Sequence, residues 1–507
     1  MKHTDIIRKL NLEQKCALLS GETVFTTRAL PGKGIPSITL SDGPNGVRKQ
    51  AGAADHLGLN PSVPATCFPT SSATACSWDE ALGEAVGEAM GEEAAAQEVA
   101  VLLGPGLNIQ RSPLCGRDFE YFSEDPILAG KMAAAYVRGI QKKGIAACPK
   151  HFAVNSQELR RMASDSVVDE RTLRELYLTG FEIVVKEARP KTIMTSYNLV
   201  NGTYANENAH LLQDILRKDW GFDGAVVTDW GGSNDHALGV KNGSTLEMPC
   251  PGGDSIRELM KAVKDGKVTE ADLDARLDEL LELVLSTHAA VEKAPRTFDA
   301  AAHHALARRA AAESIVLLKN EDGILPLKAG EKLAVIGDFA QTPRYQGAGS
   351  SAVNALQVDA LLDCIKADDS GISFVGYASG FDRQGAADPK KQEEAVSLAK
   401  QADTVLLCLG LDELRESEGL DRADMALAEN QQQLLDAVAA VNPNVVVLLS
   451  AGAPVETPWA GRCKALVYGA LGGQAGAGAA ADILTGKLCP CGKLSQTWAK
   501  AHDDTPA

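Results

Sequence analysis

Several side chains that could take part in chemistry follow directly after short apolar runs of the sequence, or stand on the segment that comes next. They are acidic, basic or aromatic: Asp42, Arg117, Lys150, His151, Tyr197, Asp229 and Trp230. Each has an ordinary structural explanation on its own, since an aspartate after a strand often caps a helix and Arg117 could pair with Glu120 or Glu124. Held in one pocket, they would supply a carboxylate nucleophile, charged groups that bind hydroxyls, and an aromatic platform. That combination suits a neutral, polyhydroxylated ligand.

The elements that must position these side chains are short apolar strands separated by helical patterns. Strands are predicted at residues 38–40, 99–103, 145–148, 192–196, 225–228 and 245–248, and helices between them at, for example, residues 170–188 and 205–219. Strands that are apolar throughout, each followed by a helix, indicate a parallel sheet covered on both faces. Over this length we expect a (β/α)8-type, TIM-like barrel, whose catalytic groups gather at the carboxyl ends of the strands.

A second alternation of strands and helices follows a long charged amphipathic stretch at residues 254–291. A helix is predicted at residues 300–317, strands at 333–336, 373–375, 404–409, 445–450 and 465–468, and helices at 392–401, 425–441 and 476–484. This pattern predicts an α/β sandwich domain. We therefore expect a barrel domain over residues 1–291, a linker and connecting helix over 292–312, and the sandwich over 313–507.

Composition and charge limit the partners. The 507 residues are 45% hydrophobic and 23% charged, with a net charge of −17, which disfavours binding to nucleic acid and to anionic membranes. The sequence shows no apolar run long enough to span a bilayer and no secretory signal, so a cytoplasmic location is expected. The eleven scattered cysteines favour reduced thiols, and Cys489 and Cys491 lack a second pair at zinc-site spacing. No metal or cofactor is predicted.

Several motifs occur in order along the chain. They are LSDGPNGVR at residues 40–48, GRDFEYFSEDP at 116–126, KHF at 150–152, Gln157 and Glu158 with Arg161, MTSYN at 194–198, TDWG at 228–231, RYQGAGSS at 344–351 and ESEGLDR at 416–422. With these motifs the chain resembles the family 3 glycoside hydrolases, the β-glucosidase-type enzymes, from about Leu12 to Trp498.

This resemblance implies a retaining mechanism with two carboxylates. Asp229 matches the nucleophile, and Glu418 matches the acid/base, with Glu416 as the competing candidate. The nucleophile must be ionised, and we expect Lys150, His151 and Arg161 to favour that state. The resemblance further implies that ring hydroxyls are held by Asp42, Arg117, Lys150, His151 and Arg161, and that Tyr197 and Trp230 border the sugar. Since the two carboxylates lie in different domains, the active site should form between the domains.

The motif around Asp42 indicates which sugar the site binds. The family's β-glucosidases use a carboxylate here for the hydroxyls at carbons 4 and 6, whereas the xylosidase branch has a Glu-Ala-Leu-His-Gly pattern, so glucose is favoured. The partner is then a small or oligomeric β-glucoside, and a homo-oligomer is left open. Thr245 replaces an Asp that supports the pocket in many members, which leaves fine specificity undecided.

Two alternatives to a β-glucosidase remain. One is a β-xylosidase or another exo-β-glycosidase of the same family. The other is a truncated, catalytically weak glycan-binding form, because many members continue past Leu494 into a fibronectin type III-like domain that this sequence does not contain.

Overall fold

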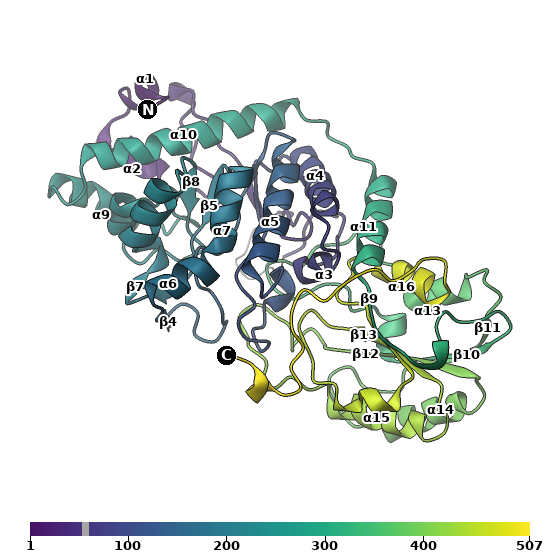
Figure 1. The fold of residues 1–507 in the computed structure, drawn as a ribbon. Coiled ribbons are helices and arrows are strands. Elements are labelled where there is room, and N and C mark those ends of the chain that lie inside the picture. Colours follow the sequence, from purple (N-terminus) through teal and green to yellow (C-terminus); the bar gives the residue numbers. More distant parts are fainter. Residues whose placement is uncertain (53–59, 507) are drawn as a thin grey trace.

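The structure, a computed structural model, describes residues 1–52 and 60–506 and consists of two bodies (Figure 1). The first is a barrel and the second is an open sheet covered by helices. Helix α10 (Glu270–Lys293) crosses the barrel, and helix α11 (Ala300–Ser314) leads from there to the sandwich. Within the described ranges, no helix has the length and apolar character needed to cross a membrane.

The barrel is a ring of short, buried, mainly parallel segments. Strands β1 (Leu40–Asp42), β2 (Val101–Leu103) and β3 (Ala146–Ala147) pair in that order, and β5 (Thr192–Met194) pairs with β8 (Ala225–Val227). Single bridges complete the ring: Phe152 with Thr195, Val227 with Leu246, Ser20 with Glu247, and Thr26 with Thr39. The predicted TIM-like barrel is therefore confirmed, with isolated bridges closing the ring between its regular strands.

Some predicted elements of the barrel differ in the structure. Residues 245–248 form only isolated bridges, because the Thr245 hydroxyl accepts the N–H of Val226 and Pro249 has no N–H to donate. The stretch at residues 254–291 is divided into α9 (Gly253–Lys264) and α10. Gly266 has a left-handed φ of 73° at the break, and Thr269 caps α10 through a capping box with Asp272.

Helices α4 (Glu80–Ala96) and α5 (Pro126–Gln141) cover the barrel and pack closely against each other. A Cβ atom on Gly139 would lie 2.2 Å from the Glu84 carbonyl oxygen, so glycine is required at this crossing. The predicted helix at residues 170–188 is present as consecutive turns, α6 (Glu170–Thr172), η3 (Leu173–Tyr177), α7 (Thr179–Ile183) and η4 (Val184–Ala188). The one predicted at residues 205–219 is divided into η5 (Ala205–Glu207) and η6 (His210–Asp219). Shorter helices are α1 (Thr4–Ile7), α2 (Leu12–Leu18), α3 (Ser71–Ala75) and α8 (His236–Asn242).

The sandwich contains a six-stranded sheet with the order β11-β10-β12-β13-β14-β9. The strands are β9 (Val316–Asn320), β10 (Lys332–Ile336), β11 (Ser373–Ala378), β12 (Thr404–Gly410), β13 (Val445–Ser450) and β14 (Ala465–Tyr468). All pairs are parallel except β14 with β9. The covering helices are α12 (Asp338–Gln341), α13 (Leu361–Lys366), α14 (Pro389–Ala399), α15 (Glu429–Ala439) and α16 (Gly476–Leu484).

Strand β9 was not predicted, and the helix expected at residues 300–317 ends at Ser314 instead. The backbone becomes extended at Ile315, where a run of apolar residues begins that includes the β-branched Val316. The residues of β9, from Val316 on, pair antiparallel with β14 at the edge of the sheet, so tertiary pairing decides their conformation.

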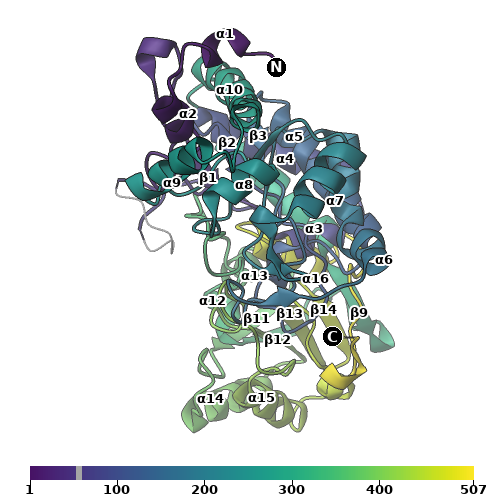
Figure 2. The ribbon, with the colours of Figure 1, turned by 90° about the vertical axis from the view of Figure 1, so that its left-hand side faces the viewer.

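Loops at the carboxyl ends of β10 and β12 meet the barrel. Figure 2 shows the sandwich below the barrel in that view. The loop after β10 pairs with the barrel at Ala65, which forms a parallel bridge with Ala355. The loop after β12 reaches the barrel at Arg422, whose N–H donates to the Leu114 carbonyl at 2.8 Å. Since the chain crosses from β11 back past β10 to β12, these two loops flank the switch point of the sheet, where open α/β sheets bind ligands.

Candidate active site

Asp229 lies just after β8, at the carboxyl end of the barrel strands, and its side chain is 11% exposed. Oδ1 accepts the N–H of Trp230 at 2.8 Å. Oδ2 has no hydrogen-bond partner among the described residues and lies 3.7 Å from Nε2 of His151. Burial raises the pKa of Asp229, and the positive charges of Arg161, Arg117 and Lys150 act against that rise.

His151 does not contribute a charge to this site. Burial, together with Arg117, Lys150 and Arg161, lowers the pKa of His151 well below its ordinary value, so the ring is neutral at about pH 7. The expectation that His151 favours ionisation of Asp229 is therefore wrong, whereas Lys150 and Arg161 act in the expected direction. The ring is held from behind, with Nδ1 3.2 Å from the Tyr121 hydroxyl and 3.4 Å from Oδ1 of Asn108.

A buried carboxylate, Glu120, joins two of the predicted cations. Arg117 donates to it through both Nε (2.7 Å) and Nη2 (2.8 Å), and Nζ of Lys150 lies 3.2 Å from Oε1. Burial alone would raise the pKa of Glu120, but the charges of Arg117 and Lys150 outweigh it and the pKa is lowered. The pairing of Arg117 with Glu120, suggested above as an ordinary structural explanation, thus occurs inside the site and fixes both cations.

Asp42 ends strand β1, and its nearest cation is Arg48, with Nη1 3.8 Å from Oδ2. Burial raises the pKa of Asp42 to about 6, although Lys150 and Arg48 act in the opposite direction. Arg48 was not predicted as a site residue. The signal available was its place in the same sequence motif as Asp42.

The aromatic residues lie next to Arg161 and Asp229. The guanidinium carbon of Arg161 is 4.7 Å from the centre of the Tyr197 ring, a cation–π distance, and the Tyr197 hydroxyl donates to the Trp230 carbonyl at 2.8 Å. The Trp230 indole N–H donates to the Val24 carbonyl at 2.8 Å, and its ring lies 5.3 Å from that of Phe25. Both aromatic side chains are therefore anchored.

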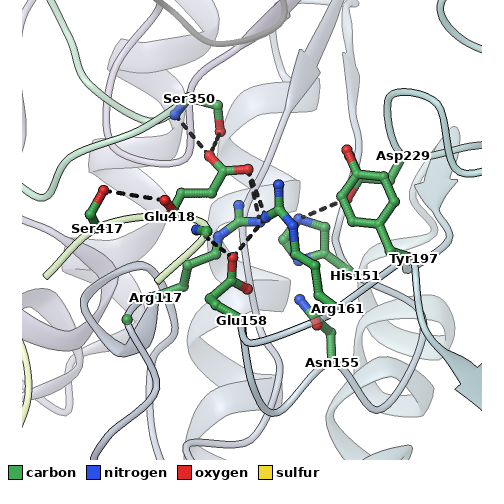
Figure 3. A network of polar contacts seen from close by, with 12 residues as sticks. Arg117, His151, Asn155, Glu158, Arg161, Tyr197, Asp229, Ser350, Ser417 and Glu418 are labelled. Atoms are coloured by element: carbon green, nitrogen blue, oxygen red, sulfur yellow. Dashed lines mark hydrogen bonds and ion pairs between the residues drawn. The ribbon is translucent and has the colours of Figure 1, made fainter. Parts of the chain in front are cut away.

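Glu418 comes from the sandwich, on the loop after β12, and reaches the cations of the barrel (Figure 3). Oε1 accepts from Nη1 of Arg161 at 2.9 Å and from Nη1 of Arg117 at 3.4 Å, and Oε2 accepts from the N–H of Ser350 at 2.8 Å and from its hydroxyl. Burial opposes ionisation, but both arginines and Ser350 hold the pKa of Glu418 well below its ordinary value. Ser350, on the loop after β10, was missed as a site residue even though its motif was noted.

Glu416, the competing candidate, points back into the sandwich. Its Oε1 accepts the N–H of Gly452 at 2.6 Å, and its Oε2 lies 3.5 Å from Nη2 of Arg344. Burial raises the pKa of Glu416 even though Arg344 lies beside it. The contacts with the barrel cations are thus made by Glu418.

Thr245 supports the strand that leads to Asp229. Its hydroxyl accepts the N–H of Val226 at 3.0 Å and donates to Oε2 of Glu279 at 2.6 Å. Glu279, on α10, in turn pairs with Arg217 and Arg276.

The parts of the chain that the structure describes contain no group of three or more His, Cys, Asp or Glu side chains that could hold a metal ion.

Comparison with known proteins places this barrel and sandwich in a family. Residues 53–283 match the glycosyl hydrolase family 3 N terminal domain and residues 315–507 the glycosyl hydrolase family 3 C-terminal domain. The chain belongs to glycosyl hydrolase family 3.

Similar proteins include the thermostable beta-glucosidase B of Acetivibrio thermocellus, 46% identical over 97% of this chain and 65% of the relative. The exo-alpha-(1->6)-L-arabinopyranosidase of Bifidobacterium longum is 45% identical over 99% of this chain and 67% of the relative. The chain thus spans about two thirds of the length of these relatives. The crystal structure of a Bifidobacterium adolescentis GH3 beta-glucosidase superimposes with a TM-score of 0.93 at 44% identity, covering 99% of this chain and 72% of that one.

Proposed function

We propose that the chain is a retaining β-glucosidase, which removes terminal non-reducing β-D-glucosyl residues through a covalent glycosyl-enzyme intermediate. The observation that carries this proposal is the convergence of two carboxylates from separate bodies. Glu418 of the sandwich binds Arg161 and Arg117, the same barrel cations whose charges act on Asp229. Retaining glycosidases need such a pair, one as nucleophile and one as acid/base.

In this proposal the free Oδ2 atom of Asp229 attacks the anomeric carbon as the bond to the leaving oxygen breaks. Glu418 gives its proton to that oxygen, and afterwards takes a proton from the water that attacks the intermediate and releases Asp229. The pKa of Glu418 is low while Arg117, Arg161 and Ser350 donate to it. For Glu418 to act as an acid, substrate hydroxyls must take over some of these donors, so that its pKa rises when the sugar binds.

The same groups that hold the carboxylates would bind the sugar. Charge-assisted hydrogen bonds from Arg117, Lys150 and Arg161 suit ring hydroxyls, and they strengthen as charge develops in the transition state. Asp42, beside Arg48, would accept from the hydroxyls at carbons 4 and 6. Glucose as the sugar is also supported by the comparisons, since proteins named beta-glucosidase occur among the most similar relatives and solved structures.

A second candidate is an exo-α-L-arabinopyranosidase, because relatives with that name are 45% identical to this chain. An α-L-arabinopyranoside has an equatorial anomeric bond like a β-D-glucoside, but it lacks the hydroxymethyl group and its hydroxyl at carbon 4 is axial. The same two carboxylates could cleave it, and the difference would lie in what Asp42 and Arg48 recognise.

The test is a panel of nitrophenyl glycosides: β-D-glucoside, β-D-xyloside, β-D-galactoside, α-L-arabinopyranoside and N-acetyl-β-D-glucosaminide. Highest kcat/KM on the glucoside, with β-glucose as the first product seen by NMR, is the expected result. Highest kcat/KM on the arabinopyranoside or the xyloside would favour that activity instead. A folded protein that binds glucose but turns over no member of the panel would contradict the proposal and favour the glycan-binding form.

We also propose a cytoplasmic location, which is supported by the eleven cysteines, all of them free thiols. Fractionation of the source cells tests it, and activity recovered outside the cytoplasm would contradict it. The oligomeric state is tested by light scattering of the purified protein.

A further inference from the structure

We propose that Asp421 is a positioning residue that fastens the acid/base loop, residues 416–422, to the barrel. This inference rests on the proposed function, because it concerns how Glu418 is held opposite Asp229. The Asp421 carboxylate accepts three backbone N–H groups of the barrel. Oδ1 accepts from Gly116 at 3.1 Å and from Glu158 at 2.9 Å, and Oδ2 accepts from Leu159 at 2.8 Å.

These hydrogen bonds join two separate barrel loops to one side chain of the sandwich. Gly116 belongs to the loop that carries Arg117, and Glu158 and Leu159 belong to the loop that carries Arg161. Arg117 and Arg161 are the two arginines that hold Glu418. A single carboxylate three residues after Glu418 therefore fixes the backbone of both loops whose side chains contact Glu418.

The attachment is reciprocal. Oε2 of Glu158 accepts the N–H of Gly419 at 2.8 Å, and it also accepts from Nη1 of Arg161 at 2.7 Å (Figure 3). Gly419 is the residue next to Glu418. The barrel loop thus binds the backbone beside the proposed acid/base, while Asp421 binds the backbone of that barrel loop. Such charge-assisted hydrogen bonds are about twice as strong as neutral ones.

The acid/base loop packs so closely against the backbone of the barrel at Gly116 that it has no room to shift toward the barrel. A Cβ atom on Gly116 would lie 1.7 Å from the Leu420 carbonyl oxygen and 2.4 Å from that of Ser417. On the far side of Asp421, the Arg422 N–H donates to Leu114 and its guanidinium donates to Pro454 at 2.8 Å. The acid/base loop is therefore held at both ends and packed directly against the backbone at Gly116.

Position matters here because the two carboxylates lie in different bodies. A retaining site needs its carboxyl groups about 5–5.5 Å apart, and catalytic groups must be held within about 0.5 Å of the productive geometry. Asp421 contributes to this separation from the sandwich side, because its carboxylate ties the loop of Glu418 to both barrel loops. An asparagine at position 421 keeps the size of the side chain but turns one acceptor into a donor that faces barrel N–H groups.

The experiment compares Asp421→Asn with wild type on two glucosides that differ in their need for acid assistance. We expect kcat/KM on cellobiose to fall about 10²-fold, the lower end of what general acid catalysis contributes. On 2,4-dinitrophenyl β-glucoside, whose leaving group needs no proton, kcat/KM should stay within about threefold of wild type. Asp424→Asn is the matched control, since Asp424 follows the same loop and is exposed. Its carboxylate lies 3.6 Å from Arg415 and accepts the N–H of Ala426 two residues on, but it makes no hydrogen bond to the barrel among the described residues, so the variant should resemble wild type on both substrates.

Equal losses on both glucosides, or no loss on either, would overturn the inference. If Asp421→Asn does not fold, as judged by near-ultraviolet circular dichroism, Gly116→Ala decides, because its Cβ displaces the acid/base loop without changing a charge. The same selective loss on cellobiose supports the inference, and uniform loss overturns it. A wild-type protein that is inactive on both glucosides would instead contradict the proposed function itself.

Discussion

Asp42 provides a prediction in which pH changes sugar specificity. Its pKa is raised to about 6 by burial, so the side chain is a carboxylate above that pH and a neutral acid below it. With this pKa, roughly nine tenths of Asp42 is ionised at about pH 7 and roughly one tenth at about pH 5. If Asp42 accepts from the hydroxyl at carbon 6, that hydrogen bond is charge-assisted only in the ionised form, where it contributes about 1.5–3 kcal/mol.

The measurement is the ratio of kcat/KM for nitrophenyl β-glucoside to that for its 6-deoxy analogue, followed from about pH 5 to about pH 8. Titration of Asp229 and Glu418 affects both substrates alike and cancels in the ratio, and kcat/KM reports the pKa of the free enzyme. We expect the ratio to fall up to about tenfold as the pH drops from 7 to 5, with a midpoint near 6. In Asp42→Asn it should be low at every pH. A wild-type ratio that does not change with pH, or the same titration in Asp42→Asn, would refute the reasoning.

Three further predictions concern the two carboxylates. Glu418→Gln should lower kcat/KM on cellobiose by about 10²–10⁴-fold and leave kcat/KM on 2,4-dinitrophenyl β-glucoside unchanged, and azide should raise kcat on the latter. Glu416→Gln is the control, and azide rescue of that variant would move the acid/base role to Glu416. Asp229→Asn should abolish turnover of every glycoside in the panel while calorimetry still detects glucose binding, and a wild-type rate would exclude it as nucleophile. Gly349→Ala should reduce kcat/KM without unfolding the protein, because Gly349 has a φ of 114° and an added Cβ would lie 2.4 Å from Cβ of Glu418. If kcat/KM depends on the leaving group of the substrate as it does in wild type, Gly349 does not position Glu418.

Much of the barrel and of the site was predictable because the signals are local. A short apolar strand followed by a polar side chain marks the carboxyl end of a barrel strand, and this placed Asp42 and Asp229 at the site. Parallel strands that are buried on both faces read as continuous apolar runs, which is why β12 and β13 were found within about a residue of their ends.

What could not be predicted depends on contacts between distant segments. Val316 and Leu317 continue an alanine-rich helical pattern in the sequence, and only pairing with β14 makes them extended. The charge of His151 depends on how many cations surround it and how deeply it is buried, and neither can be read from its sequence motif. Glu120 and Ser350 stood inside recognised motifs. The contact of Glu120 with Lys150 and that of Ser350 with Glu418, however, join residues 30 and 68 positions apart.

The arrangement of the two bodies follows from one rule applied twice. In a barrel the carboxyl ends of the strands gather the functional loops, and in an open parallel sheet the ligand lies at the carboxyl edge where the strand order reverses. That reversal lies between β10 and β12, whose loops carry Ser350 and Glu418. The carboxyl ends of the barrel strands and the carboxyl edge of the sheet face each other across the candidate site. The barrel contributes Asp229 and the cations, and the sandwich contributes Glu418. Substitutions at the contact between the bodies should therefore change acid catalysis before they change the fold, since each body keeps its own hydrophobic core.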